Sequence, residues 1–278
     1  MKYRGYSEVT GSDVSGLGEQ VGRQRERVRA RLALVGRVLA VMSGKGGVGK
    51  TYVSTGLARG LARRGLRVGL LDADLAAPTA ARLLGARGPL RVDELEVHPA
   101  IGQDGVLVFS SDLLLDEGAP LRWRGPEGDR FVWRGIREAG ALREFISDVA
   151  WGELDALVVD LPPGTDRLAD LADLAGNRPE VVAVTIPSEE SRRAVARAVR
   201  AALDAGLAVR GIVENMSGYA CPCCATVYPM FRGNAGTALA EEFGVRLLAS
   251  FPFTPVEDEA DACPPRVDLA DLLREAVA

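Results

Sequence analysis

One glycine-rich segment constrains the fold more than any other part of the chain. Residues 43–51 read Ser-Gly-Lys-Gly-Gly-Val-Gly-Lys-Thr and lie between an apolar run at 38–42 and a helix-forming stretch at 50–64 that ends at Gly65. A strand, a glycine-rich turn and a helix in this order begin a parallel α/β unit. The length of 278 residues is compatible with a single domain built from such units.

The rest of the chain continues this alternation of apolar runs and amphipathic stretches. Short apolar runs without polar alternation are typical of parallel strands that are buried on both faces. We expect a doubly wound α/β fold with a mainly parallel sheet and helices on both faces. The expected strands are 38–42, 67–71, 106–109, 156–160, 181–186, 209–213 and 246–251, and the expected helices are 50–64, 79–84, 140–149 and 189–205.

The beginning of the chain differs in composition from the rest. It is polar and rich in arginine, and Val21, Val28, Leu32 and Val35 recur at intervals of seven, four and three residues, so that the three valines are seven apart. This spacing predicts a helix with a thin apolar stripe, and a solvated leader helix is favoured over a nucleic-acid-binding arm. The expected organisation is a leader at 1–35 and one domain at 36–278, with a cysteine-containing loop at about 219–231.

Composition excludes several classes of function. The formal net charge of −4 argues against a nucleic-acid-binding protein that relies on overall basicity. The single histidine, His98, excludes a histidine-rich zinc hydrolase. The chain has no apolar run of the ~18 residues that a membrane span needs, and it begins without a signal-peptide pattern. We therefore expect a cytoplasmic protein without a membrane partner.

The glycine-rich segment also predicts a ligand. Gly44 and Gly49 are the two glycines of the G-x-x-x-x-G-K-T pattern, in which backbone N–H groups and a helix N-terminus surround phosphate oxygens. Lys50 then reaches the β- and γ-phosphates of a nucleotide and the hydroxyl of Thr51 binds Mg²⁺. Only three of the 34 basic residues are lysines, and Lys45 is a second one in the same loop.

Acidic residues follow two of the expected strands. Asp72 and Asp74 come directly after the strand at 67–71, and Asp160 ends the apolar run at 156–160. Because carboxyl ends of parallel strands face the ligand crevice, we expect Asp160 to hold a magnesium-bound water. Gly164, which lacks a Cβ, allows its backbone to approach the γ-phosphate. For Asp74 alone, a structural role as a helix cap is an alternative to a role in the ligand crevice.

Three of the four cysteines lie within four residues. Cys221 and Cys224 have C-x-x-C spacing with Cys223 between them, whereas Cys263 stands alone. This grouping cannot form a disulfide framework, so metal or redox chemistry is favoured. Two thiolates are half of a four-thiolate site for zinc or a [4Fe–4S] cluster. The remaining two thiolates must come from Cys223, Cys263 or a second subunit. A two-fold dimer supplies all four, two from each subunit.

The sequence GKGGVGKT resembles the deviant Walker A motif of the ParA/MinD class of dimeric ATPases. The resemblance implies that Lys45 reaches the nucleotide of a partner subunit, that Asp74 orients the attacking water and that Asp72 lies near the magnesium shell. It also implies that Asn215, after the strand at 209–213, recognises an adenine edge; an ordinary turn asparagine is the alternative. Tyr52 departs from the small hydroxyl residue usual at that position. The expected nucleotide contacts are Gly44, Lys45, Gly46, Gly47, Val48, Gly49, Lys50, Thr51, Tyr52, Gly164 and Asn215.

The longer series GKGGVGKT, DADLAAPT, DALVVDLPPGT and VENMSGYACPCC resembles, in the same order, the Mrp/ApbC family of iron–sulfur cluster carrier ATPases. The resemblance implies a homodimer with slow, dimer-dependent ATP hydrolysis. It also implies a labile [4Fe–4S] cluster, held by Cys221 and Cys224 with Cys223 as an additional candidate, and apo-proteins and a cluster scaffold as partners. The chain departs from the family pattern at Ala77 and in PPGTD, where the family reads PPGTGD.

Two other functions remain open from the sequence. A ParA/MinD-like positioning ATPase would use the same loop to cycle on DNA or a membrane, but it has no use for a C-x-x-C loop. A zinc-binding, ATP-dependent regulator with little turnover is compatible with Tyr52 and with the shortened PPGTD segment. The metal that the cysteines bind discriminates between these functions.

Overall fold

The computed structural model describes residues 17–93, 96–114, 140–176 and 178–254. Within them the chain forms a nine-stranded sheet in the order β3-β4-β2-β5-β1-β6-β7-β8, and β9 pairs with β7. The strands are β1 (Val35–Ser43), β2 (Val68–Asp72), β3 (Ala100–Ile101), β4 (Leu107–Phe109), β5 (Leu154–Asp160), β6 (Glu180–Thr185), β7 (Ala208–Ala220), β8 (Val227–Tyr228) and β9 (Arg246–Phe253). Cys263 lies outside the described residues.

The sheet is parallel except at two short strands. β1 lies between β5 and β6, and β2, β4, β7 and β9 extend the same parallel arrangement. Only β3 and β8 pair antiparallel among the described strands. Every residue of β2 is buried, as is expected of a strand covered on both faces. The predicted doubly wound, mainly parallel fold is confirmed.

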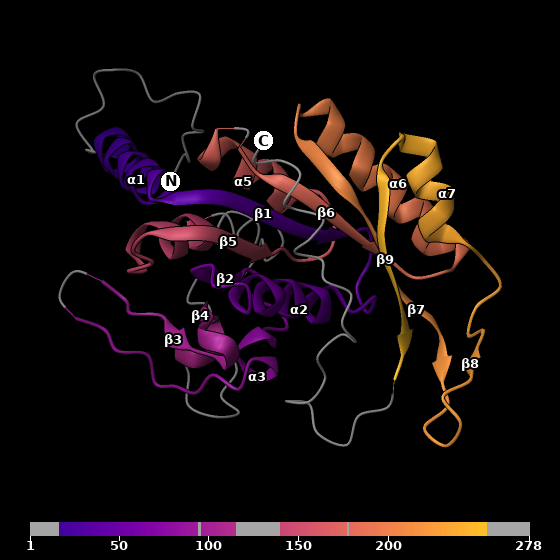
Figure 1. Ribbon diagram of the computed structural model, residues 1–278. Helices are drawn as coiled ribbons and strands as arrows, with labels where there is room; N and C mark the ends of the chain where they lie inside the picture. The colour runs from indigo at the N-terminus through magenta and orange to yellow at the C-terminus, as the bar shows by residue number, and fades with distance from the viewer. Residues whose placement is uncertain (1–16, 94–95, 115–139, 177, 255–278) are drawn as a thin grey trace, which may run out of the picture.

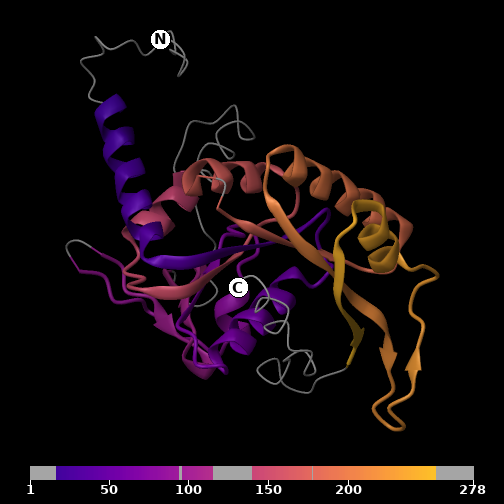
Figure 2. The same cartoon turned by 45° about the horizontal axis from the view of Figure 1, so that its top comes forward.

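Helices cover both faces of the sheet (Figures 1 and 2). On one face, α2 packs on β2 and β5; on the other, α6 packs on β6 and β7, and α7 on β7 and β9. Residues 140–148 are also helical. The helices are α1 (Leu17–Ala33), α2 (Lys50–Ala62), α3 (Ala80–Leu83), α5 (Asp166–Ala175), α6 (Glu189–Asp204) and α7 (Ala235–Phe243), and two 3₁₀ turns lie at Gln103–Gly105 and Ser111–Leu114.

The arginine-rich helix α1 packs against the rest of the described chain. Val28 and Leu32 of its apolar stripe are buried, and α1 contacts α5. The guanidinium group of Arg178 donates to the carbonyl oxygen of Leu32 at 3.0 Å, and Arg31 is paired with Glu96. The helix is therefore attached to the domain by apolar and polar contacts. The division of the chain at residue 35 remains a proposal.

β7 is longer than the sequence predicts and has an irregularity in its middle. Its pairing with β9 shifts register between Asn215, which is opposite Phe251, and Tyr219, which is opposite Phe253. Met216, within this shift, has φ 54°, a left-handed conformation that is uncommon for a residue with a side chain. The strand therefore continues past its expected end at residue 213 and ends directly before the cysteine segment (Figure 1).

No helix among those the structure describes is long and apolar enough to cross a membrane.

Candidate nucleotide site and cysteine hairpin

The glycine-rich loop connects the end of β1 to the first residue of α2. Gly47 and Gly49 have φ 77° and 78°, left-handed values that glycine adopts without strain. A Cβ atom on Gly49 would lie 2.1 Å from Nδ2 of Asn215, so the loop also needs glycine here for close packing. The loop therefore directs the N-terminus of α2, with its unpaired N–H groups, toward one side of the sheet.

A cleft of about 770 Å³ opens in front of this loop. Its volume is in the range of small-molecule and cofactor sites. Gly44, Lys45, Asp72, Asp160, Gly164 and Asn215 do not line it. It is lined by Ser43, Gly46, Gly47, Val48, Gly49, Lys50, Thr51, Tyr52, Ala73, Asp74, Leu75, Ala76, Ala77, Thr79, Leu83, Pro162, Pro163, Asp166 and Arg167.

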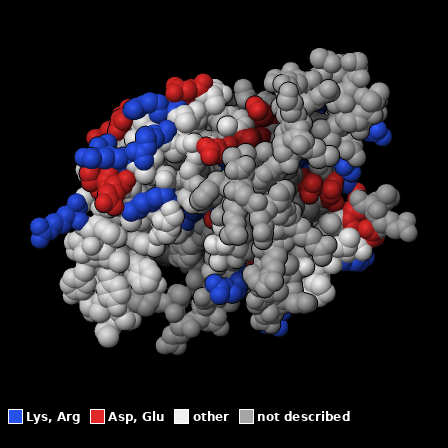
Figure 3. All heavy atoms as spheres, turned by 180° about the vertical axis from the view of Figure 1, so that it is seen from behind, with Lys and Arg blue, Asp and Glu red and all other residues white. Residues whose placement is uncertain are grey.

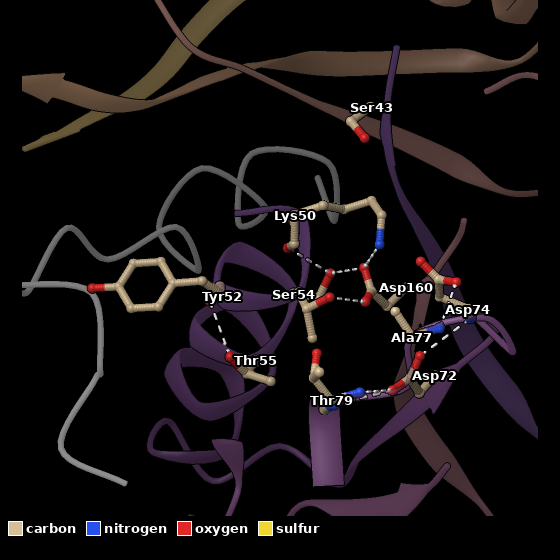
Figure 4. A network of polar contacts seen from close by, with 12 residues as sticks. Ser43, Lys50, Tyr52, Ser54, Thr55, Asp72, Asp74, Ala77, Thr79 and Asp160 are labelled. Atoms are coloured by element: carbon tan, nitrogen blue, oxygen red, sulfur yellow. Dashed lines mark hydrogen bonds and ion pairs between the residues drawn. The ribbon is translucent and has the colours of Figure 1, made fainter. Parts of the chain in front are cut away.

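Asp160, at the end of β5, is the centre of a buried polar cluster (Figure 4). Its Oδ1 atom lies 2.7 Å from Nζ of Lys50 and accepts a hydrogen bond of 2.8 Å from the hydroxyl of Ser54. Its Oδ2 atom accepts a hydrogen bond of 2.6 Å from the hydroxyl of Thr51. The Asp160 side chain is fully buried and that of Lys50 is 7% exposed. In this arrangement the loop lysine is paired with the carboxylate of Asp160.

Asp72 is opposite Asp160 in the register of β2 and β5. Its Oδ2 atom accepts from the backbone N–H groups of Thr79 at 2.9 Å and Ala80 at 3.0 Å, and from the hydroxyl of Ser110 at 3.1 Å. Its Oδ1 atom accepts from the N–H group of Asp74 at 3.2 Å. Asp72 thus fixes the segment between β2 and α3.

Burial raises the pKa of Asp72 to about 7, and the negative charge of Asp160 contributes to the increase. The hydrogen bonds from the backbone N–H groups of Ala80, Thr79 and Asp74 oppose it. The pKa of Asp72 is raised because two carboxylates lie side by side in a dry interior, where charge is costly. The ammonium group of Lys50 contacts Asp160.

Asp74 and Lys45 occupy different surroundings. Asp74 lines the cleft, and its Oδ1 atom accepts from the N–H groups of Ala76 at 3.2 Å and Ala77 at 3.3 Å. The helix-capping role considered for Asp74 falls to Asp72, which binds the N–H groups at the start of α3. Lys45 points to the beginning of α6, where its Nζ atom is 3.8 Å from Glu190.

Asn215 and Gly164 contact the loop from behind. The side-chain amide of Asn215 donates to the carbonyl oxygen of Val48 at 3.0 Å, and the side chain is buried. The N–H group of Gly164 donates to the carbonyl oxygen of Ser43 at 3.0 Å. Through these bonds both residues support the loop, and their predicted contacts with adenine and the γ-phosphate remain predictions.

The cysteine segment forms the end of an antiparallel hairpin made by β7 and β8, which projects beyond the sheet (Figure 1). The N–H group of Cys221 donates to the carbonyl oxygen of Thr226 at 3.0 Å, and that of Ala225 donates to Cys221 at 2.8 Å. Cys223 and Cys224 are exposed and Cys221 is half-buried; all three are free thiols. We call residues 219–228 the cysteine hairpin.

Within the hairpin, Cys221 and Cys224 lie side by side. Hydrogen bonds with Thr226 lower the pKa of the Cys224 thiol, and a further hydrogen bond with Cys221 contributes to the decrease. A lower pKa favours the thiolate, which is the form that binds metals. No group of three or more His, Cys, Asp or Glu side chains in the described part of the chain is arranged to hold a metal ion. The hairpin of one chain therefore offers a pair of thiols.

Together the fold and the loop define a P-loop NTPase: a lysine from the glycine-rich turn after β1 lies against an aspartate at the end of the neighbouring strand β5. The profile described as "ParA: NUBPL iron-transfer P-loop NTPase" matches residues 34–271. The chain belongs to this family of iron–sulfur cluster carrier P-loop NTPases, as its motifs predict.

Known proteins agree with this assignment. The chain is 38% identical over 252 residues to the iron-sulfur cluster carrier protein of Saccharolobus solfataricus, covering 90% of this chain and 82% of the relative. It is 38% identical to the human cytosolic Fe-S cluster assembly factor NUBP2 over 81% of this chain and 82% of that protein.

Solved structures are also similar. A nucleotide-binding protein of Archaeoglobus fulgidus in complex with ADP has a TM-score of 0.67 and 32% identity over 89% of each chain. The cell division ATPase MinD of Pyrococcus furiosus, at 22% identity over 87% of this chain and 99% of that chain, has a TM-score of 0.52 and shares the fold.

Sequence reasoning missed two serines of the buried cluster. Ser54 of α2 contacts Asp160, and Ser110, directly after β4, contacts Asp72. A serine inside a helix or after a strand carries no chemical signal by itself. The position of Ser54, one helical turn after Lys50 and so on the same face, could have indicated it.

Proposed function

We propose that this chain is an ATP-binding and ATP-hydrolysing homodimeric carrier, which holds a labile iron–sulfur cluster as cargo on the cysteine hairpin and passes it to apo-proteins. One observation carries the proposal. The same strand, β7, contacts the nucleotide loop through Asn215 and leads directly into the turn that carries the adjacent thiols of Cys221 and Cys224. A P-loop cleft and a thiol pair are the two components that such a carrier needs.

The nucleotide phosphates are expected to bind the N–H groups of residues 46–51 at the start of α2, in the cleft that these residues line. Lys50 then exchanges the carboxylate of Asp160 for the β- and γ-phosphates. Tyr52 lines the same cleft, while its ring points away from Asp160 (Figure 4). The binding reaction therefore takes Lys50 from an ion pair inside the protein.

This exchange creates a need for a divalent cation. When Lys50 leaves, the buried carboxylate of Asp160 loses the cation that contacts it, and an uncompensated charge is costly there. Thr51 and Asp160 are expected to hold Mg²⁺, with Asp72 in a supporting position because its oxygens already accept four hydrogen bonds. Bound Mg²⁺ neutralises charge on the phosphates.

Hydrolysis is assigned to Asp74 and Lys45. Asp74 lines the cleft, where its carboxylate can orient the attacking water. Lys45 does not line the cleft of its own chain and lies near Glu190 with a side chain that is 36% exposed. Such a lysine is free to contribute charge to the nucleotide of a second copy, which makes turnover dependent on a dimer.

The cargo site also needs two copies. A [4Fe–4S] cluster takes four thiolates, and one hairpin supplies Cys221 and Cys224. Around them lie exposed apolar side chains: Val227, Tyr228, Met230 and Phe253 are 44–54% exposed. Such side chains beside a half-complete thiolate site are suited to contact with a second copy of the hairpin. Cys223, exposed in the same loop, is a candidate substitute ligand during transfer to a client or from a scaffold protein.

The alternatives have weaker support. Over α6 and α7, positive and negative side chains alternate on the surface (Figure 3), and Glu242 pairs with both Arg192 and Arg200. That face is not the basic surface on which a positioning ATPase would track DNA. A zinc-binding regulator would use the same thiols.

We place the carrier in the cytoplasm, in line with relatives named as cytosolic assembly factors.

Two measurements on the purified chain test this function. In calorimetry, Lys50→Ala should abolish ADP and ATP binding, and normal binding by this variant would refute the nucleotide site. After anaerobic reconstitution, iron and sulfide in equal amounts, with a cluster absorption spectrum, should appear in the parent protein. Zinc without sulfide would favour the regulator.

A further inference from the structure

Ser54 is a third donor on Asp160 and lies outside the G-x-x-x-x-G-K-T pattern. Its side chain is fully buried, and its Oγ atom is 2.8 Å from Oδ1 of Asp160 and 3.1 Å from the carbonyl oxygen of Lys50. A hydroxyl has one proton to donate, and the shorter contact is with a charged acceptor. The proton is therefore assigned to the hydrogen bond with Asp160, the shorter of the two Ser54 contacts drawn in Figure 4.

The three donors on Asp160 have different fates when a nucleotide binds. Under the proposed function, the ammonium group of Lys50 turns to the phosphates and the hydroxyl of Thr51 turns to the metal ion. Ser54 lies one helical turn further along α2, behind the loop, and does not line the cleft. It therefore stays on the carboxylate while the other two donors leave.

We propose that Ser54 is a positioning residue, which holds the carboxylate of Asp160 in the orientation that a divalent cation requires once Lys50 and Thr51 have left it. The inference rests on the proposed nucleotide function and adds a residue to its metal site. Asp72 does not need this support, because Ser110 and the backbone at 79–80 hold it independently. The function of Ser54 is thus specific to Asp160.

The expected signature is a separation of metal binding from nucleotide binding. Without the Ser54 hydroxyl, the carboxylate of Asp160 can rotate away from the metal position, so metal affinity falls. Ser54 does not line the cleft in which residues 46–51 are expected to bind the phosphates, so nucleotide binding without metal should change far less than metal binding. A purely structural defect in α2 would weaken both.

Thr55 provides a matched control. It is the next residue of the same helix, it is 3% exposed, and its hydroxyl donates to the carbonyl oxygen of Tyr52 at 3.0 Å instead of to Asp160. Thr55→Val removes a buried hydroxyl and keeps the shape of the side chain. It therefore reproduces the general cost of such a loss without touching the carboxylate.

The experiment compares the full-length parent, Ser54→Ala and Thr55→Val by two measurements: ADP affinity in EDTA by calorimetry, and Mn²⁺ affinity of the ADP-loaded protein by electron paramagnetic resonance. Ser54→Ala should bind Mn²⁺ about tenfold more weakly, equivalent to ~1.4 kcal/mol, because a hydrogen bond to a charged group is lost. Its ADP affinity in EDTA should stay within about twofold of that of the parent. Thr55→Val should match the parent in both.

Two results would overturn the assignment of Ser54: an unchanged Mn²⁺ affinity in Ser54→Ala, or an equal loss in both variants. Failure of the parent itself to bind ADP would instead refute the proposed nucleotide function. The two failures are therefore distinguishable.

Discussion

Asp72 is a carboxylate whose ionisation opposes folding. Burial and the charge of Asp160 raise its pKa to about 7, whereas an unfolded aspartate titrates near ~3.9. Between these two pH values Asp72 is ionised in the unfolded chain and still protonated in the folded chain. The contribution of Asp72 to stability therefore falls as the pH rises through this window. At pH values above the pKa of the folded state, the loss of stability caused by the ionisation of Asp72 reaches its full size.

This predicts a pH-dependent difference between the parent and Asp72→Asn, which cannot ionise. In metal-free buffer, the free energy of unfolding of the parent should decrease relative to the variant from about pH 4 to about pH 7, by at most ~1.4 kcal/mol per pH unit. Urea titrations of both proteins across this range measure the difference. A constant difference would show that Asp72 does not ionise in this window.

Lys45 and Asp74 should affect turnover without affecting binding. Lys45 does not line the cleft of its own chain, and the carboxylate of Asp74 contacts only the backbone N–H groups of Ala76 and Ala77 among the contacts described. We expect Lys45→Ala and Asp74→Ala to bind ATP with near-parent affinity and to lose at least ~100-fold in phosphate release, the scale of one charge-stabilising or acid–base group. Parent-like turnover in both variants would remove these residues from the mechanism.

At the scale of elements, the glycines of the loop between β1 and α2 differ in how much space a side chain would find. Gly49→Ala places a Cβ 2.1 Å from the Asn215 amide at φ 78°, whereas a Cβ on Gly46 meets nothing within 4 Å. Gly49→Ala should therefore lower the free energy of unfolding by ~2 kcal/mol or more, and Gly46→Ala should change it by less than ~1 kcal/mol. Chemical denaturation without nucleotide compares them, and equal values would contradict this packing.

The sequence predicts the central strands well, because continuous apolar runs such as 156–160 have few alternatives in an α/β chain. It does not predict α5, which follows the Pro-Pro-Gly segment directly, or α7, whose small residues carry a weak periodic signal. The extension of β7 is also missed, because Asn215, Met216 and Ser217 interrupt its apolar run. The pairing with β9 and with β8 shows that the strand continues.

The site is predicted in part for a similar reason. Lys50, Thr51 and Asp160 are predicted to belong to one site because each lies in a motif at the carboxyl end of a strand, and the carboxyl ends of parallel strands face one ligand crevice. Contacts between distant segments, such as Ser110 with Asp72 and Asn215 with Val48, depend on strand order, which the local pattern does not encode.

For the molecule as a whole, β7 joins the two candidate sites. Asn215 holds the carbonyl oxygen of Val48 in the loop, and the cysteine hairpin begins four residues later on the same strand. The hairpin of one chain presents two adjacent thiols. The central claim is therefore that a cluster forms only where two chains meet and that loss of either thiol releases it.

Native mass measurement of the anaerobically reconstituted protein, with iron and sulfide counted, tests this claim most directly. The parent should carry one [4Fe–4S] cluster per two chains, with no cluster on single chains. Cys221→Ala and Cys224→Ala should lose the cluster and keep ATP binding, Cys223→Ala should lose it in part, and Cys263→Ala should keep it. A cluster on isolated single chains, or one that survives in Cys221→Ala and disappears in Cys263→Ala, would contradict the account.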